Sequence, residues 1–208
     1  MSIATTTTTA AIYLVHLNPM TTAHKSIISM LKKNYRVYVF PVSFVKGGQE
    51  INTKSLPFSY HLRKQMVESV FGDSVVVLPD YAFYAPYSKY LPPLLSSRSW
   101  KLRNQIITQI NEKKFVSYTG DKAERLMLKA YRLNPLKANR LEVSASSIRA
   151  KLYRQVVEGD SDEEWRGKVP EAVVGIIKKN WNIVDNFARM EDSTTRVMGM
   201  KFPKEGYK

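Results

Sequence analysis

Two hydroxyl side chains and a histidine follow the first apolar run of the chain, in the stretch HLNPMTTAH. Thr21 and Thr22 supply the hydroxyls, and His24 falls in the first turn of the helix that residues 23–33 predict. Amide groups at a helix start attract anions, and an imidazole there can donate to a phosphate oxygen. The stretch therefore predicts a phosphate site near Ala23, and a capping or surface role is the alternative for His24.

A second predicted helix start carries residues of the same kind, in the stretch SASSIR. Ser144, Ser146 and Ser147 offer hydroxyls, and Arg149 places a guanidinium one turn into the helix. A guanidinium can fork onto two phosphate oxygens. Taken alone this is an ordinary helix cap, but two anion sites at two helix starts fit one triphosphate held between the halves of a sheet.

The charge of the chain also favours anionic partners. The 208 residues include 32 Lys and Arg against 18 Asp and Glu, which gives a net charge of +14 and a pI near 9.8. Residues 98–154 hold 14 basic and four acidic residues, so most of the excess lies in one stretch. Such a field attracts nucleic acid or a nucleotide triphosphate, and a solubilising surface is the alternative.

Composition excludes several classes of protein. Because the chain has no cysteine and only three histidines, disulfides and a protein-held zinc ion are not expected, and we expect no metal ligands. No apolar run reaches the roughly 18 residues that a membrane span needs, and the first ten residues do not resemble a secretory signal. We expect a cytoplasmic protein without membrane contact, and a homo-oligomer.

Apolar runs alternate with helical patterns along the chain, as in a doubly wound α/β fold with a Rossmann-like parallel sheet. The runs predict strands at 11–17, 35–42, 74–79, 114–120 and 139–143. The helical patterns lie at 23–33, 57–71, 99–110, 121–131 and 147–157. In such folds ligands bind outside the carboxyl ends of the strands, which is where both anion sites would lie.

The same pattern predicts four segments. They are a disordered start at 1–10, the Rossmann-like domain at 11–160, a small C-terminal helical appendage at 161–189 and a tail at 190–208 to which we assign no function.

Two polar or aromatic stretches, 43–57 and 81–97, interrupt the alternation. Loops of that length are often lids or substrate walls. For the aromatic residues of 81–97 we favour the alternative, which is packing in a satellite core.

The chain resembles the HxGH-type nucleotidyltransferases. Their first-strand motif G-x-F-(N/D/Q)-P-x-(H/T)-x-G-H is similar to VHLNPMTTAH, which includes Asn18, and their late motif S-x-(S/T)-x-I-R is similar to SASSIR. The resemblance looks closest to archaeal-type nicotinamide mononucleotide adenylyltransferases and their viral relatives. It covers about residues 11–185, and the other similar segments are LPFSYHLR, SWKLRNQI, YTGDKAE and EEWRGKVPEAVVGIIKK.

Four positions depart from the family pattern. Val15 and Ala23 stand where the family has glycine, His16 replaces a residue that is often arginine, and Thr21 replaces the first histidine. We expect Val15 to narrow the approach of a nucleotide to the strand end, and His16 to take over the phosphate contact of the arginine.

The resemblance implies adenylyl transfer, in which the phosphate of a mononucleotide attacks the α-phosphorus of ATP and pyrophosphate leaves. It assigns His24 and Arg149 to the charge that develops on the phosphates. The ATP phosphates would be held by His16, Thr21, the amides near Ala23, Ser144, Ser146 and Ser147. Asn18, Gly120 and Asp121 would also belong to the nucleotide-binding site.

For the acceptor, nicotinamide mononucleotide, the resemblance implies Trp100 near the nicotinamide ring and Arg63 near the phosphate. The alternatives are a half-buried helix aromatic for Trp100 and a surface ion pair for Arg63. Mg²⁺ would be held by phosphate oxygens and water.

Two other functions stay open. A sister enzyme could use CTP, or another acceptor such as phosphopantetheine or a sugar or polyol phosphate. A catalytically degenerate nucleic-acid-binding module is the non-enzymatic alternative, because of the net charge and Val15.

Overall fold

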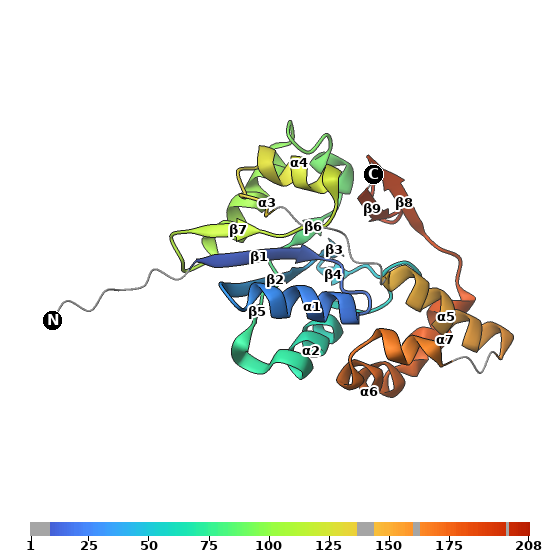
Figure 1. The fold of residues 1–208 in the computed structure, drawn as a ribbon. Helices are drawn as coiled ribbons and strands as arrows, with labels where there is room; N and C mark the ends of the chain where they lie inside the picture. Colours follow the sequence, from blue (N-terminus) through green and yellow to red (C-terminus); the bar gives the residue numbers. More distant parts are fainter. Residues whose placement is uncertain (1–8, 137–143, 160–162, 199) are drawn as a thin grey trace.

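The structure, a computed structural model, describes residues 9–136, 144–159, 163–198 and 200–208. Its centre is a four-stranded parallel sheet in the order β5-β2-β1-β7 (Figure 1). The strands are β1 (Ala10–Val15), β2 (Arg36–Pro41), β5 (Val76–Val77) and β7 (Phe115–Ser117). The strand predicted at 139–143 lies outside the described residues.

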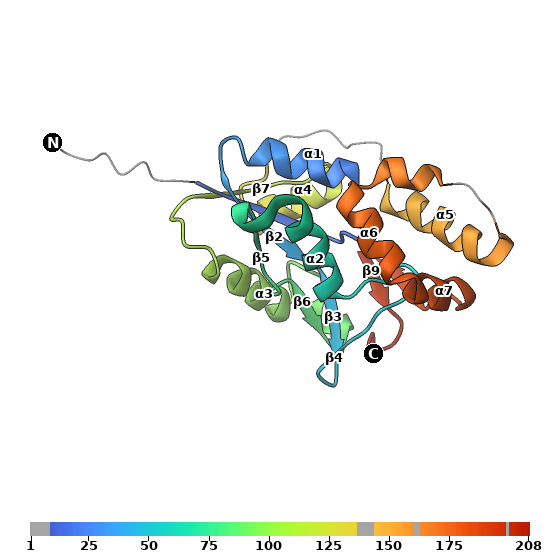
Figure 2. The ribbon, with the colours of Figure 1, turned by 90° about the horizontal axis from the view of Figure 1, so that it is seen from below.

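Helices cover both faces of this sheet, which confirms the predicted doubly wound α/β fold (Figures 1 and 2). On one face lie α1 (Thr22–Leu31) and α2 (Tyr60–Phe71), and on the other lie α3 (Ser97–Thr108) and α4 (Lys122–Ala130). The chain builds β1, β2 and β5 in one direction and then returns to place β7 on the other side of β1. This reversal opens a crevice beside β1 at the carboxyl ends of the strands.

The side-chain alternation of β1 divides the interior into two cores. Ala11 and Tyr13 join the core beneath α1 and α2, whereas Ala10 and Ile12 join the core beneath α3 and α4. All four side chains are buried. Because both faces of the central strand are apolar, it requires a helical layer on each side.

The C-terminal part of the chain adds helices to the face that α1 and α2 cover. They are α5 (Ala145–Glu158), the short 3₁₀ helix η3 (Glu164–Lys168), α6 (Glu171–Lys179) and α7 (Trp181–Arg189). Helix α5 packs on α7, and α6 packs on α2 (Figure 2). The buried Trp165 of η3 belongs to the same core as α1 and α2, so this part is continuous with the main domain.

A second, smaller sheet replaces part of the two stretches predicted as loops. It has the order β4-β3-β6, with β3 (Ser43–Lys46), β4 (Gln49–Glu50) and β6 (Ala82–Tyr84). Gly47 and Gly48 have φ of 58° and 79°, which allows the two-residue hairpin turn between β3 and β4. The loop prediction was wrong here because the Gly47–Gly48 turn pairs β3 with β4, and β6 pairs in parallel with β3.

The aromatic residues of 81–97 mostly pack inward, as favoured above. Phe83, Tyr87 and Tyr90 are buried in the core beneath α3, whereas Tyr84 is exposed. The short 3₁₀ helix η2 (Tyr87–Tyr90) lies on this side, next to α3, whereas η1 (Gly72–Ser74) directly follows α2.

Residues 190–198 and 200–208 are structured. They form an antiparallel hairpin of β8 (Thr194–Val197) and β9 (Met200–Pro203), which lies beside the body of the domain near β6 (Figure 1). Among the described residues, no helix has the length and apolar character that crossing a membrane requires.

Candidate functional site

A cavity of about 690 Å³ lies at the carboxyl end of β1, within the size range of small-molecule sites. Its wall comes from the end of β1, the starts of α1, α4 and α5, and the β8–β9 hairpin. Eight of the predicted site residues line it: His16, Ala23, His24, Gly120, Asp121, Ser144, Ser146 and Arg149. The fold therefore brings the two predicted phosphate-binding helix starts to one cavity.

His24 is part of a capping box at the start of α1. Its Nδ1 accepts a hydrogen bond of 3.0 Å from the backbone N–H of Thr21, and the backbone N–H of His24 donates to the Thr21 hydroxyl at 3.3 Å. His24 therefore does cap α1, as the alternative interpretation holds, and it does so through Nδ1 alone. Because Nδ1 accepts, the ring proton resides on Nε2, and the hydrogen bonds of the described residues leave this N–H for a ligand.

Burial keeps the His24 ring neutral at physiological pH. Desolvation lowers the pKa of His24 from 6.5 to about 4. A neutral ring with a fixed tautomer is a hydrogen-bond donor of constant protonation state over the range in which a phosphate monoester is ionised. The site therefore provides a donor through Nε2 and no proton relay through Nδ1.

Arg149 is buried in the first turns of α5, opposite the start of α1. Its Nη1 donates to the backbone carbonyl of Asn18. The Asn18 side chain, in turn, accepts from the N–H of Phe58 at 2.9 Å and donates to its carbonyl at 3.2 Å. Asn18 therefore fixes the loop that orients Arg149. It does not line the cavity, whereas the prediction placed it in contact with the nucleotide.

The three serines of SASSIR have different positions: Ser144 and Ser146 line the cavity, and Ser147 does not. Ser144 is the N-cap of α5 and accepts from the N–H of Ser146, and the two hydroxyls lie 2.6 Å apart. The hydroxyl of Ser147 donates to the carbonyl of Ser144 at 2.7 Å, and this side chain does not line the cavity. Ser144 and Ser146 are the two hydroxyls placed to contact a ligand.

The start of α4 contributes the acidic residues of the cavity. Asp121 caps α4 by accepting from the N–H of Glu124 at 2.9 Å, and the Thr119 hydroxyl donates to the Glu124 carboxylate at 2.5 Å. Burial and the nearby Asp121 raise the pKa of Glu124, although the Thr119 bond opposes the shift. Thr119 and Glu124 line the cavity and were not predicted.

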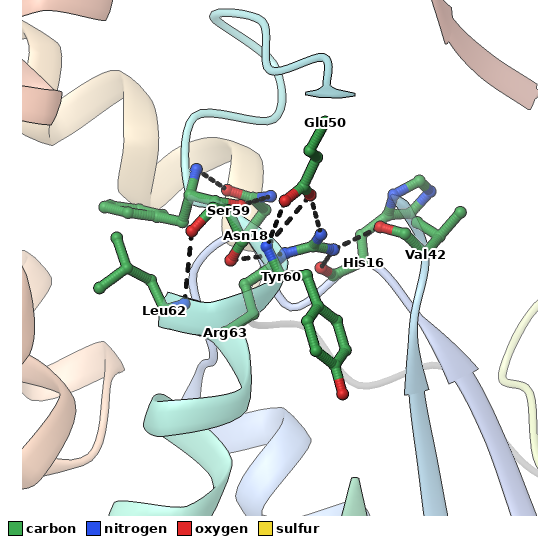
Figure 3. A network of polar contacts seen from close by, with 9 residues as sticks. His16, Asn18, Val42, Glu50, Ser59, Tyr60, Leu62 and Arg63 are labelled. Carbon is green, nitrogen blue, oxygen red and sulfur yellow. Dashed lines mark hydrogen bonds and ion pairs between the residues drawn. The ribbon is translucent and has the colours of Figure 1, made fainter. Parts of the chain in front are cut away.

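Arg63 is buried and lies outside the cavity wall, which corrects the prediction that it binds the acceptor phosphate. Figure 3 shows its guanidinium among the polar groups that it contacts. Its side chain is 2% exposed. The guanidinium donates to the carbonyls of His16 at 3.0 Å and Val42 at 2.5 Å, and forms an ion pair with Glu50 at 2.8 Å. Arg63 thus holds the ends of β1 and β2 together with the β4 strand.

Trp100 is also placed differently from the prediction. It is half-buried at the start of α3, its Nε1 donates to the carbonyl of Leu94 at 2.9 Å, and its ring packs edge-on against Tyr131 with centroids 5.0 Å apart. It does not line the cavity. The alternative of a half-buried helix aromatic therefore describes Trp100.

His16 and Val15 lie at the end of β1, in the cavity wall. Desolvation by the surrounding protein lowers the pKa of His16, and the positive charges of Arg63, Lys201 and Arg149 lower it further. His16 is consequently neutral at physiological pH, and it can donate or accept a hydrogen bond without a full charge. Val15 occupies part of the wall at which a glycine would leave more room.

The two threonines at the start of α1 bond to backbone groups of the protein. Thr21 is fully buried and its hydroxyl caps α1, and the Thr22 hydroxyl donates to the carbonyl of Lys168 at 3.2 Å. Neither lines the cavity, so the structure does not place them against a ligand as predicted.

No motif or periodic pattern in the sequence indicates the cavity residues of the C-terminal hairpin. Arg196 and Lys201 face the same cavity as His24 and Arg149. They lie in a segment without a motif, and only the path of the chain brings them to the site.

Among the described residues, no group of three or more His, Asp or Glu side chains could hold a metal ion. The donor set of the cavity is mainly hydroxyl, imidazole and cationic, with Asp121 and Glu124 as its acidic members. Such a set suits the binding of an anion.

Comparisons with known proteins give a fold but no sequence family. Neither the models of known families nor the curated proteins match the chain. Among solved structures, a bifunctional NMN adenylyltransferase/ADP ribose pyrophosphatase from Francisella tularensis, complexed with AMP and a manganese ion, is similar with a TM-score of 0.60 at 15% identity. The match covers 87% of this chain and 52% of that one, so this chain spans about half the length of that protein.

Two further structures match over nearly their whole length. A putative nicotinate-nucleotide adenylyltransferase from Vibrio parahaemolyticus has a TM-score of 0.52 at 16% identity, over 86% of this chain and 96% of that one. A nicotinic acid mononucleotide adenylyltransferase from Plasmodium falciparum, complexed with NaAD, has a TM-score of 0.51 at 14% identity, over 86% and 98%. The chain therefore has the α/β fold found in these nucleotidyltransferases.

Proposed function

We propose that the chain is a nucleotidyltransferase that transfers AMP from ATP to nicotinamide mononucleotide, with release of pyrophosphate. The observation that supports this function most directly is the convergence of His24 and Arg149, at the starts of α1 and α5, on one cavity. Two helix starts that point at one space provide amide donors and a favourable dipole for a polyphosphate. The motifs around these two residues resemble those of the HxGH-type nucleotidyltransferases, and the similar segments SWKLRNQI, YTGDKAE and EEWRGKVPEAVVGIIKK support assignment to the archaeal-type branch.

The proposed reaction requires positioning and charge neutralisation more than acid–base chemistry. An oxygen of the mononucleotide phosphate attacks the α-phosphorus of ATP in line, the bond from that phosphorus to the bridging oxygen breaks, and the electron pair leaves with pyrophosphate. The Nε2–H of His24 and the guanidinium of Arg149 stabilise the charge that develops on the departing group. The ionised phosphate needs no general base.

The base of the acceptor requires an apolar pocket. A smaller cavity of about 60 Å³ adjoins the main one and shares Leu14, Tyr81, Phe83 and Glu124 with it. Its aromatic walls provide the stacking surface that was expected from Trp100. In this proposal the acceptor ring enters here, while its phosphate points toward Arg149.

A divalent cation would enter the site with the nucleotide. The described residues do not form a carboxylate cage, and Mg²⁺ commonly binds through phosphate oxygens and water. Bound in this way, it would reduce the negative charge that the chain's own cations must neutralise.

The test of the proposed function is a pyrophosphate-release assay. ATP, CTP and GTP are each combined with nicotinamide mononucleotide, its acid form and phosphopantetheine, and we expect turnover to be fastest with ATP and nicotinamide mononucleotide. Preference for the acid form would change the acceptor, and turnover with CTP alone would make the protein a cytidylyltransferase.

The net charge of +14 supports nucleic-acid binding as a second candidate function. Polyanion binding of that kind weakens steeply as salt increases, because phosphate contacts release counterions. Absence of turnover with every substrate, together with a steep salt dependence of binding to a DNA or RNA duplex, would support the second candidate over the first.

A further inference from the structure

The C-terminal hairpin is anchored to the domain by an aromatic side chain that packs into the core beneath α3 and α4. Phe202 of β9 is 1% exposed and packs against Phe44 and Phe83, with ring centroids 5.7 and 5.8 Å away. Beyond β9, the carbonyls of Gly206 and Tyr207 accept hydrogen bonds from residues 87 and 88 at 2.9 and 3.0 Å. These contacts hold the hairpin as a wall of the domain, and they determine where its other side chains lie.

The cavity side of the hairpin carries two cations. Lys201 and Arg196 line the cavity together with Arg149. The Lys201 ammonium donates to the Ser55 hydroxyl at 3.2 Å, and that hydroxyl donates to the Asp192 carboxylate at 2.7 Å. Ser55 therefore orients the Lys201 side chain, and Asp192 orients Ser55.

The charges around Lys201 are mostly of the same sign. Burial and the nearby Arg149 and Arg196 lower the pKa of Lys201, although Asp192 opposes this shift. A cluster of cations in a concave wall is stabilised when an anion occupies the space between them. The position of the cluster beside the α1 and α5 starts indicates which anion fits, because both helix starts favour phosphate oxygens.

We propose that Lys201 is a phosphate-binding residue of the cavity, supplied by the C-terminal hairpin to the polyphosphate chain of a ligand that also contacts Arg149. Arg196, exposed at the rim, adds to the field that attracts such a ligand. The inference rests on the proposed function in that the polyphosphate belongs to a nucleoside triphosphate. It adds a residue that lies outside every motif of the sequence and assigns a role to the segment 190–208.

Lysine suits this position because its ammonium is a compact point charge on a flexible stem. Arg149 is fixed by its bond to the Asn18 carbonyl, whereas the Lys201 ammonium has three N–H donors and can keep its bond to the Ser55 hydroxyl while it donates to a phosphate oxygen. Because the orienting bond is kept, the gain from a charge-assisted bond to phosphate is largely retained.

The experiment measures binding of inorganic tripolyphosphate by titration calorimetry, which requires no turnover. The variants are Lys201→Gln, Lys201→Arg and the matched control Lys204→Gln, which removes an exposed lysine of the same segment outside the cavity. We expect Lys201→Gln to raise Kd about ten- to a hundredfold, as for loss of one charge-assisted bond. Lys204→Gln should change Kd less than twofold, and Lys201→Arg should retain most of the affinity.

A shared site also predicts coupling between Lys201 and Arg149. If both contact one ligand, the effect of Lys201→Gln in an Arg149→Gln background should differ from its effect in the wild type. Ser55→Ala leaves the cation in place and removes its orienting partner, so its Kd should lie between those of the wild type and Lys201→Gln. This variant keeps the test valid if Lys201→Gln fails to fold.

Two outcomes would overturn the inference. One is an equal Kd for Lys201→Gln and Lys204→Gln, and the other is no tripolyphosphate binding by the wild type. The proposed function fails separately, since Lys201-dependent tripolyphosphate binding without any product from ATP and a mononucleotide would leave the phosphate site intact and remove the reaction.

Discussion

The backbone N–H of Thr21 and Nδ1 of His24 are joined by a hydrogen bond of 3.0 Å, and this bond gives the two nitrogens of the ring different tasks. Nδ1 caps α1, while Nε2 carries the proton that a phosphate oxygen can accept. The capping and ligand-binding roles of His24 are therefore compatible, and substitutions can separate them.

Replacement of His24 by Asn should abolish the donor and keep the cap. The Oδ1 atom of Asn can accept from the Thr21 N–H, but Asn has no atom at the position of Nε2. We expect kcat to fall about a hundredfold or more in both His24→Asn and His24→Ala, with a much smaller change in the KM for ATP. Only the Ala variant should also lose roughly 1 kcal/mol of unfolding free energy. Full activity of His24→Asn in steady-state kinetics would limit His24 to its capping role.

Acid should destabilise the protein partly through His24. Burial lowers the pKa of His24 in the folded state to about 4, below the ordinary value of 6.5. The unfolded state therefore binds more protons between pH 6.5 and 4, and stability is lost as the pH falls through this window. At pH 5 the loss due to His24 should be about 1 to 2 kcal/mol. Denaturant titrations at pH 7.5 and 5 should show a smaller loss of unfolding free energy in His24→Asn than in the wild type. His16, whose pKa is also lowered, is present in both proteins, so its contribution cancels in this comparison.

Arg149 should not tolerate exchange for lysine. A lysine cannot both donate to the Asn18 carbonyl and fork onto two phosphate oxygens, as the guanidinium can. We expect Arg149→Lys to lower kcat/KM roughly ten- to a hundredfold. Arg154→Lys, on an exposed position of the same helix, is the matched control and should leave the constant unchanged. Equal kinetics for the two variants would exclude a bidentate contact.

Arg63→Ala should destabilise the fold. The change leaves the Glu50 carboxylate and the carbonyls of His16 and Val42 without their common donor. Loss of one partner of a buried ion pair typically costs about 3 to 5 kcal/mol. Glu50→Gln keeps an acceptor for the Arg63 and Tyr60 N–H groups and should cost less. Urea unfolding tests the order, and a stable Arg63→Ala protein with only a raised acceptor KM would restore the substrate-binding role.

Trp100→Ala should affect stability more than substrate binding. The indole packs on Tyr131 and bonds to the Leu94 carbonyl, outside the cavity. We expect a loss of roughly 2 kcal/mol, below the range for a fully buried tryptophan, with both KM values within about a factor of two. A selective increase in the acceptor KM, measured beside an unchanged melting temperature, would contradict this placement.

Local patterns in the sequence were sufficient for the central strands β1, β2, β5 and β7, for helices α1 to α5 and for the two helix starts of the site. A period of two places Ala11 and Ile12 on opposite faces of β1, and a hydroxyl residue before a helical pattern indicates a cap, as Ser144 shows. Because carboxyl ends of parallel strands meet at one edge, the same patterns also predict that His24 and Arg149 share a cavity.

Tertiary structure decided the residues whose role depends on distant partners. Arg63 has the residue type of a phosphate ligand, but the carboxylate of Glu50 and two strand-end carbonyls surround it. Trp100 turns toward Tyr131 because α3 and the segment after α4 pack together. Lys201 reaches the cavity because Phe202, the next residue, is anchored in a core that long-range packing creates. The spacing of residues along the sequence does not predict such contacts, because their energies arise only when segments far apart in the chain pack together.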